Sequence, residues 1–105
     1  MGYSPTYSYD ETNVRRYAPL EPGVYRLMYP DTAGRMIVFY IGKSDVRLED
    51  RLLAHLQPSE QNGCIKLMLK SRQCFFDFVV IASQFERDTF EKQEIQRYNP
   101  QCNRT

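Results

Sequence analysis

Apolar, β-branched and aromatic residues are concentrated in three segments of the chain, which predicts three β-strands. Residues 23–29 and 36–42 are two of these segments, and the residues between them, Pro30 to Arg35, have the composition of a turn. These two segments are therefore predicted to form a β-hairpin. The third segment, residues 74–82, is predicted to be a separate strand.

Helical patterns lie between and after these strands. Residues 45–57 carry leucines at the spacing of one buried helix face. Asn62 is placed to cap a short second helix. Ser83 and Glu86 form a capping-box pattern, which predicts a last helix that reaches about Tyr98. The order strand, strand, helix, helix, strand, helix is typical of an α+β domain.

The predicted hairpin brings two tyrosines together. If Tyr29 pairs with Met36, the same register pairs Tyr25 with Tyr40. Directly opposed residues of an antiparallel pair lie on one face, with Cβ atoms about 5 Å apart. A shift of one residue would place the two phenols on opposite faces. We therefore expect two tyrosines side by side, provided that this register holds.

The first 21 residues differ from the rest of the chain. They contain Tyr3, Tyr7, Tyr9 and Tyr17 but no sustained apolar periodicity. Residues 1–21 are therefore predicted to be an extension, either mobile or packed on the domain through its tyrosines. Packing is the favoured alternative, and stacking of the rings on nucleic-acid bases is the other use considered.

The composition is that of a single folded domain without strong charge. The chain has 105 residues, of which 42% are hydrophobic and 26% charged, and its formal net charge is +1. Any contact with nucleic acid would therefore depend on a local cluster of positive charge. No apolar run approaches the roughly 20 residues of a membrane span, and the first residues lack a secretory-signal pattern, so membrane and exported classes are not expected.

Cysteine and histidine limit the possible metal sites. The three cysteines, Cys64, Cys74 and Cys102, match no common zinc spacing, and we expect free thiols in a reducing cytoplasm. The chain has one histidine, His55, so a site with two imidazole ligands from the same chain is excluded.

Charged residues interrupt the apolar faces of two predicted helices. Arg51 and His55 lie one turn apart beside the leucine face. Glu91 falls on the face of the last helix that is expected to be buried, although Glu94, about 60° away around the helix, is an open alternative. An ion pair with Arg51 or Arg87 is the ordinary explanation for such a carboxylate. Tyrosine and histidine can move protons, cations can hold phosphate, and a carboxylate can hold a divalent metal.

These residues occur in an order that resembles the GIY-YIG nuclease family. Gly23-Val24-Tyr25 and Tyr40-Ile41-Gly42-Lys43 are similar to its two signature motifs. Arg51 and His55 follow in R-x-x-x-H spacing, and the sequence ends with the pattern E-x8-P-x-x-N, formed by Glu91, Pro100 and Asn103. The resemblance covers residues 22–103.

The resemblance implies a three-stranded antiparallel sheet flanked by helices, with residues 22–105 as the nuclease-like domain. It implies one divalent cation, Mg²⁺ with Mn²⁺ as a substitute, and selects Glu91 over Glu94 as its ligand. Tyr25 matches a candidate general base, Tyr40 a group that orients the nucleophile or phosphate, and Arg51 the residue that stabilises the phosphate. His55 matches a position that handles protons or contacts phosphate. Gly42, Lys43 and Asn103 match substrate-binding positions.

The implied function is a metal-dependent endonuclease that hydrolyses DNA by attack of water at a single site. DNA, duplex or branched, is the expected partner, with a homodimer or a separate targeting protein as a further possibility. A catalytically silent module that binds nucleic acid or a protein is the alternative. The interval from Gly42 to Arg51 is one residue longer than in several branches of the family, which leaves Arg47 as a substitute for Arg51.

Overall fold

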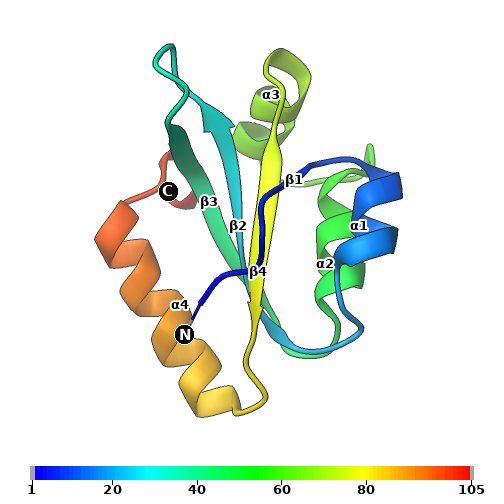
Figure 1. Cartoon of the computed structure of the whole chain (residues 1–105), viewed down its shortest axis with the longest axis vertical. Helices are drawn as coiled ribbons and strands as arrows, with labels where there is room; N and C mark the ends of the chain where they lie inside the picture. The colour runs from blue at the N-terminus through cyan, green and yellow to red at the C-terminus, as the bar shows by residue number, and fades with distance from the viewer. Residues whose placement is uncertain (1, 105) are drawn as a thin grey trace.

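The computed structural model describes residues 2–104, which form an antiparallel sheet with helices on both faces (Figure 1). Its strands are β1 (Tyr7–Ser8), β2 (Gly23–Pro30), β3 (Met36–Ser44) and β4 (Phe75–Val80), in the spatial order β1-β4-β2-β3. The α+β class is confirmed, but the sheet has four strands rather than three. The additional strand comes from the N-terminal segment, which pairs with the outer edge of β4.

Four helices cover the sheet. They are α1 (Glu11–Tyr17), α2 (Leu48–His55), α3 (Gly63–Ser71) and α4 (Gln84–Tyr98), and a 3₁₀ turn, η1 (Gln101–Asn103), follows α4. Figure 1 shows α4 on one side of the sheet and α1 and α2 on the other. Among residues 2–104, no helix is both long and apolar enough to cross a membrane.

The predicted caps are present at two helix starts. The Asn62 side chain accepts a hydrogen bond from the Ile65 N–H, and the Ser83 hydroxyl accepts one from the Glu86 N–H. The helix predicted over residues 45–57 begins three residues later, because residues 45–47 form a turn in which the Ser44 hydroxyl donates to the Arg47 carbonyl.

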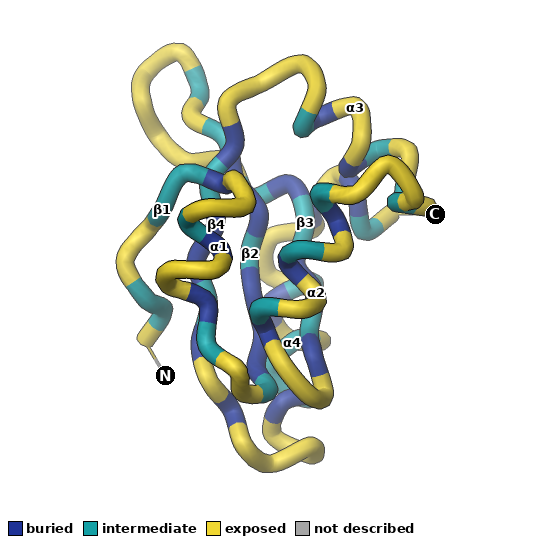
Figure 2. The backbone as a smooth tube through the Cα atoms, turned by 90° about the vertical axis from the view of Figure 1, so that its right-hand side faces the viewer, coloured by how far each residue is buried: buried dark blue, intermediate teal, exposed yellow. Residues whose placement is uncertain are grey.

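The two faces of the sheet bury separate apolar clusters. On one face, side chains of the sheet pack under α1, α2 and α3; the principal members are Tyr25, Leu27, Phe76, Val14, Leu52 and Ile65. On the other face, a smaller cluster packs under α4, and it includes Val24, Ile41, Val79 and Ile95. Figure 2 shows α1 and α2 in front of the first of these faces, and buried positions alternate with exposed ones along both helices.

The N-terminal segment is packed on the domain through its tyrosines, as the favoured alternative predicted. The Tyr9 hydroxyl donates to the Leu52 carbonyl at 2.6 Å in the core, and the ring of Tyr7 stacks on Tyr17 with centroids 4.0 Å apart. These contacts attach β1 and α1 to the sheet and to α2.

Cys64 and Cys102 form a disulfide, so the prediction of three free thiols is wrong; Cys74 alone is free, and it is buried. The two bonded cysteines are 38 residues apart in the sequence. The fold brings η1 against the start of α3, where the Asn62 amide donates to the Cys102 carbonyl. Sequence spacing carries no information about this contact, which is why the pairing was missed.

Candidate active site

Tyr25 and Tyr40 lie on the same face of the hairpin, with ring centroids 6.2 Å apart. They are not directly opposed, however, and the predicted register is wrong. Tyr25 is opposite Gly42, and Tyr40 is opposite Leu27, so the two phenols are diagonal neighbours.

Two separate shifts produce this register. The loop closes with Pro30, rather than Tyr29, opposite Met36, and a β-bulge between Leu27 and Met28 adds one residue of β3. Each feature moves the pairing by one position. Because the side chains of a strand alternate between faces, two such shifts return both tyrosines to the same face.

Gly23 and Gly42, the glycines of the two hairpin motifs, each lie too close to neighbouring atoms for a side chain to fit. A Cβ atom on Gly42 would lie 2.4 Å from the hydroxyl oxygen of Tyr25, so the phenol occupies the space that a side chain would fill. A Cβ atom on Gly23 would lie 2.2 Å from the carbonyl oxygen of Val79 on the neighbouring strand. The first contact places the Tyr25 hydroxyl directly against β3.

His55 is 2% exposed and connects Tyr25 to a carboxylate. Its Nε2 atom lies 2.6 Å from the Tyr25 hydroxyl oxygen, and its Nδ1 atom contacts Glu60 Oε2. Burial lowers the pKa of His55, although the nearby Glu60 carboxylate opposes this shift. The imidazole is therefore neutral at neutral pH. Glu60 was not predicted, and its position shortly after the predicted helix is the only signal in the sequence.

Arg51 is the cation beside both phenols. Burial raises the pKa of Tyr25 and of Tyr40, and the positive charge of Arg51 opposes the rise in each case. Arg47, the alternative, precedes α2 and accepts the Ser44 hydroxyl through its backbone. Of the two arginines considered from the sequence, Arg51 is therefore the one whose charge acts on both tyrosines.

The two carboxylates of α4 have different surroundings. Glu94 is the more buried, at 6% exposure, and its Oε1 accepts a hydrogen bond from the Tyr3 hydroxyl at 2.7 Å. Glu94, the alternative that the sequence left open, is therefore the more buried of the two carboxylates. Glu91 is half-buried and has no ion pair within residues 2–104; burial raises its pKa, and the Lys43 charge opposes this rise.

Glu91 is chemically suited to hold a divalent cation. No group of three or more histidine, cysteine or acidic side chains in the described part of the chain is arranged to bind a metal. A single hard carboxylate with no cationic partner fits Mg²⁺, which retains several waters and needs few protein ligands. A cation at Glu91 would also compensate the charge that burial disfavours.

Two other predicted site residues are engaged with the protein itself. Lys43 pairs with Asp88 at 2.5 Å and with Asp45 at 3.2 Å. The Asn103 side chain accepts the Ile41 N–H and donates to the Ile41 carbonyl, both at 2.8 Å. Asn103 therefore fixes the backbone of β3 beside Tyr40 instead of presenting a free amide.

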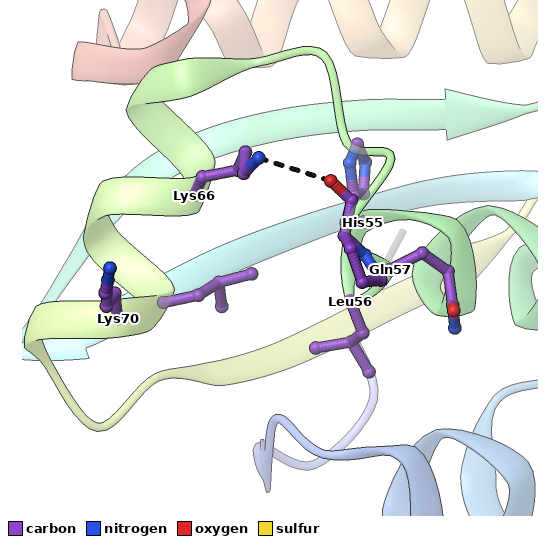
Figure 3. Close-up of a pocket in the computed structure, with 7 residues that line it drawn as sticks. His55, Leu56, Gln57, Lys66 and Lys70 are labelled. Carbon is purple, nitrogen blue, oxygen red and sulfur yellow. Dashed lines mark hydrogen bonds between the residues drawn. The ribbon is translucent and has the colours of Figure 1, made fainter.

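An open cavity of about 290 Å³ adjoins His55 between α2 and α3 (Figure 3). Leu56, Pro58 and Leu69 supply much of its apolar lining, and Lys66 and Lys70 are its cationic members. Neither lysine has an acidic partner among residues 2–104, and Lys66 donates to the Pro58 carbonyl at 3.2 Å. The cavity thus carries unpaired positive charge beside the candidate active site.

The resemblance to the GIY-YIG nuclease family rests on the residues just described: the glycine-supported tyrosines of the hairpin, Arg51 and His55 of α2, and Glu91 of α4. A family model described as the UvrC-like GIY-YIG domain matches residues 21–104. The chain therefore belongs to the GIY-YIG family.

The fold is also similar to solved structures of the GIY-YIG N-terminal endonuclease domain of UvrC from Thermotoga maritima. The form bound to its catalytic divalent cation, magnesium, has a TM-score of 0.65 and 26% identity, covering 88% of this chain and 97% of that chain. A variant with asparagine replaced by alanine, bound to its catalytic divalent cation, has a TM-score of 0.64 and 26% identity, covering 86% and 93%. A comparison with curated protein sequences finds no match.

Proposed function

We propose that the chain is a divalent-metal-dependent endonuclease that hydrolyses DNA phosphodiester bonds by attack of water at a single site. The observation that carries this proposal is the convergence of Tyr25, Tyr40, Arg51 and His55 on one face of the sheet. The magnesium-bound UvrC domain, which shares this fold, supports the metal requirement.

Glu91 would hold the cation, Mg²⁺ or Mn²⁺. When bound, a divalent cation supplies Lewis-acid stabilisation of the phosphate charge and lowers the pKa of bound water. The half-buried carboxylate has no ion pair within residues 2–104 that would compete for this role.

Tyr25 and His55 would remove the proton of the attacking water. The water passes a proton to the Tyr25 oxygen while the tyrosine passes its own proton to Nε2 of neutral His55, 2.6 Å away. Such a coupled transfer requires no free phenolate, which the raised pKa of Tyr25 makes scarce.

Arg51 would bind the scissile phosphate, and its movement would let a water molecule reach the Tyr25 hydroxyl. The Tyr25 side chain has no exposed surface, whereas Arg51 is exposed and its charge acts on both phenols. When the guanidinium turns to a phosphate, its planar fork can hold two oxygens, and a water can take its place beside the phenol. Tyr40, which is partly exposed, would orient that phosphate.

The other matched residues act indirectly in this proposal. Gly42 leaves room for the Tyr25 hydroxyl, and Asn103 holds β3 in place. Lys43 would contact substrate only by exchanging Asp45 or Asp88 for a phosphate.

The test is metal-dependent nicking of plasmid and branched DNA by the purified chain. Glu91→Gln is expected to abolish Mg²⁺-dependent cleavage, because the amide removes the anionic ligand. The matched control on the same helix is Glu94→Gln, which keeps an acceptor for the Tyr3 hydroxyl and is expected to cleave at nearly the wild-type rate. Circular dichroism would establish that both variants fold.

Three outcomes would contradict the proposal. Loss of activity in Glu94→Gln but not in Glu91→Gln would show that Glu94, and not Glu91, is the metal ligand. Binding of DNA without cleavage by the wild-type chain would favour the catalytically silent module. Neither binding nor cleavage would favour a structural domain.

A further inference from the structure

Glu60 contacts the buried His55, and the proposed function gives it no role. Its Oε2 atom contacts Nδ1 of His55, and its Oε1 atom accepts a hydrogen bond from the Asn62 N–H at 2.8 Å. Both carboxylate oxygens are thus occupied by different partners. The orientation of the carboxylate is determined by the protein before any substrate binds.

The loop that carries Glu60 is itself fixed at several points. Asn62 caps α3 through the Ile65 N–H, and its amide donates to the Cys102 carbonyl in η1. The disulfide between Cys64 and Cys102 joins the same two segments. A carboxylate on such a loop is well positioned to hold a neighbouring side chain in one orientation.

The contacts of His55 determine which of its nitrogens carries hydrogen. Tyr25 keeps its proton at neutral pH, because burial raises its pKa, so its hydroxyl donates to Nε2. A neutral imidazole with an accepting Nε2 carries its hydrogen on Nδ1, which donates to Glu60. The Glu60 carboxylate is anionic there, because the Asn62 N–H and His55 outweigh the effect of burial and lower its pKa.

We propose that Glu60 is a positioning residue that keeps His55 in the Nδ1–H tautomer and stabilises the imidazolium formed when His55 accepts the proton of Tyr25. This inference rests on the proposed function, since it assigns Glu60 a part in that reaction. The O–H bond of Tyr25 breaks as an N–H bond forms at Nε2, and the water's proton restores the tyrosine. His55 later returns its proton to solvent, while water protonates the leaving 3′ oxygen.

The decisive variant is Glu60→Gln. The Asn62 N–H would hold the amide oxygen at the position of Oε1, so the amide NH₂ would face Nδ1 of His55. Nδ1 must then accept, Nε2 carries the hydrogen, and Nε2 can no longer accept a proton from Tyr25. The structure therefore predicts a reversal of the tautomer and not merely a weaker contact.

Nitrogen-15 NMR of the imidazole measures this directly, because His55 is the only histidine of the chain. We expect the Nδ1–H tautomer in the wild type and the Nε2–H tautomer in Glu60→Gln. We also expect kcat to fall by roughly 10²- to 10³-fold with KM unchanged, since Glu60 does not touch substrate in this scheme. Glu60→Asp retains a carboxylate and is expected to restore the tautomer and part of kcat.

Glu86→Gln, at an exposed position of α4, is the matched control and is expected to change neither quantity. A folded Glu60→Gln variant that keeps the Nδ1–H tautomer, or that keeps the wild-type kcat, would overturn the inference. The tautomer is measured without DNA, so it tests the role of Glu60 even if the wild-type chain proves not to be a nuclease.

Discussion

The protonation states of the site residues follow from where each side chain lies. Tyr25 and His55 are buried, and burial raises the pKa of the phenol and lowers that of the imidazole, so both are neutral at neutral pH. Arg51 stays charged, because a guanidinium keeps its proton far above neutral pH, and the pKa of Arg51 is raised further here. The site therefore combines a neutral pair that exchanges protons with a permanent cation.

Substitution of Arg51 is expected to affect the chemical step. Arg51→Ala should lower the single-turnover cleavage rate by roughly 10²- to 10³-fold, as does loss of one preorganised charge stabiliser. Arg51→Lys should recover only part of this rate, because an ammonium group lacks the planar fork of a guanidinium. Arg47→Ala is the matched control and should cleave normally; the opposite result would identify Arg47 as the catalytic arginine.

The last element of the chain, η1, holds the active-site strand through two kinds of bond. Asn103 in η1 forms two hydrogen bonds with Ile41 of β3, and Cys102 beside it is bonded to Cys64 at the start of α3. The disulfide thus fastens the segment that supports β3 to the segment that follows Glu60. Breaking it would loosen both attachments.

Reduction of this disulfide is expected to lower the free energy of unfolding by about 2–4 kcal/mol, since it closes a loop of 38 residues. Denaturant unfolding with and without dithiothreitol measures this effect. The matched control is the double variant Cys64→Ser/Cys102→Ser, whose stability should not respond to the reductant. A wild-type chain with equal stability in both conditions would contradict the expectation.

Charge over the whole molecule is nearly balanced, and much of it is used internally. Six of the 14 lysine and arginine residues form ion pairs within residues 2–104, namely Arg15, Arg26, Arg35, Lys43, Arg87 and Arg97. The Arg26–Asp77 pair, for example, joins β2 to β4. Of the eight others, Arg51 lies beside the two phenols, and Lys66 and Lys70 line the cavity beside His55.

DNA binding by this chain is expected to depend only weakly on salt. About four phosphate contacts would give a slope of about −4 in a plot of log K against log[salt]. Fluorescence anisotropy over a KCl series without Mg²⁺ measures the slope in the absence of cleavage. A slope steeper than about −6 would contradict the expectation, because it would require a more extensive basic surface.

The sequence by itself determined the three main strands, the helices of the nuclease-like domain and the identity of most candidate site residues. The strands and helices follow from local periodicity and capping, and Asn62 and Ser83 each act as the predicted N-cap. The candidate site residues follow instead from the resemblance of their order to the GIY-YIG motifs. The shared face of Tyr25 and Tyr40 was also predicted, although from the wrong register, because two one-residue shifts cancel in their effect on the face.

Only the tertiary structure decided the features that join distant segments. Cys64 meets Cys102, and Glu60 reaches His55 from a loop outside the helix. Buried Glu94 accepts a hydrogen bond from Tyr3, 91 residues away, whereas Glu91 has no ion pair within residues 2–104. Contacts of this kind depend on how elements that are distant in the sequence pack together, and periodicity within a single segment carries no information about that packing.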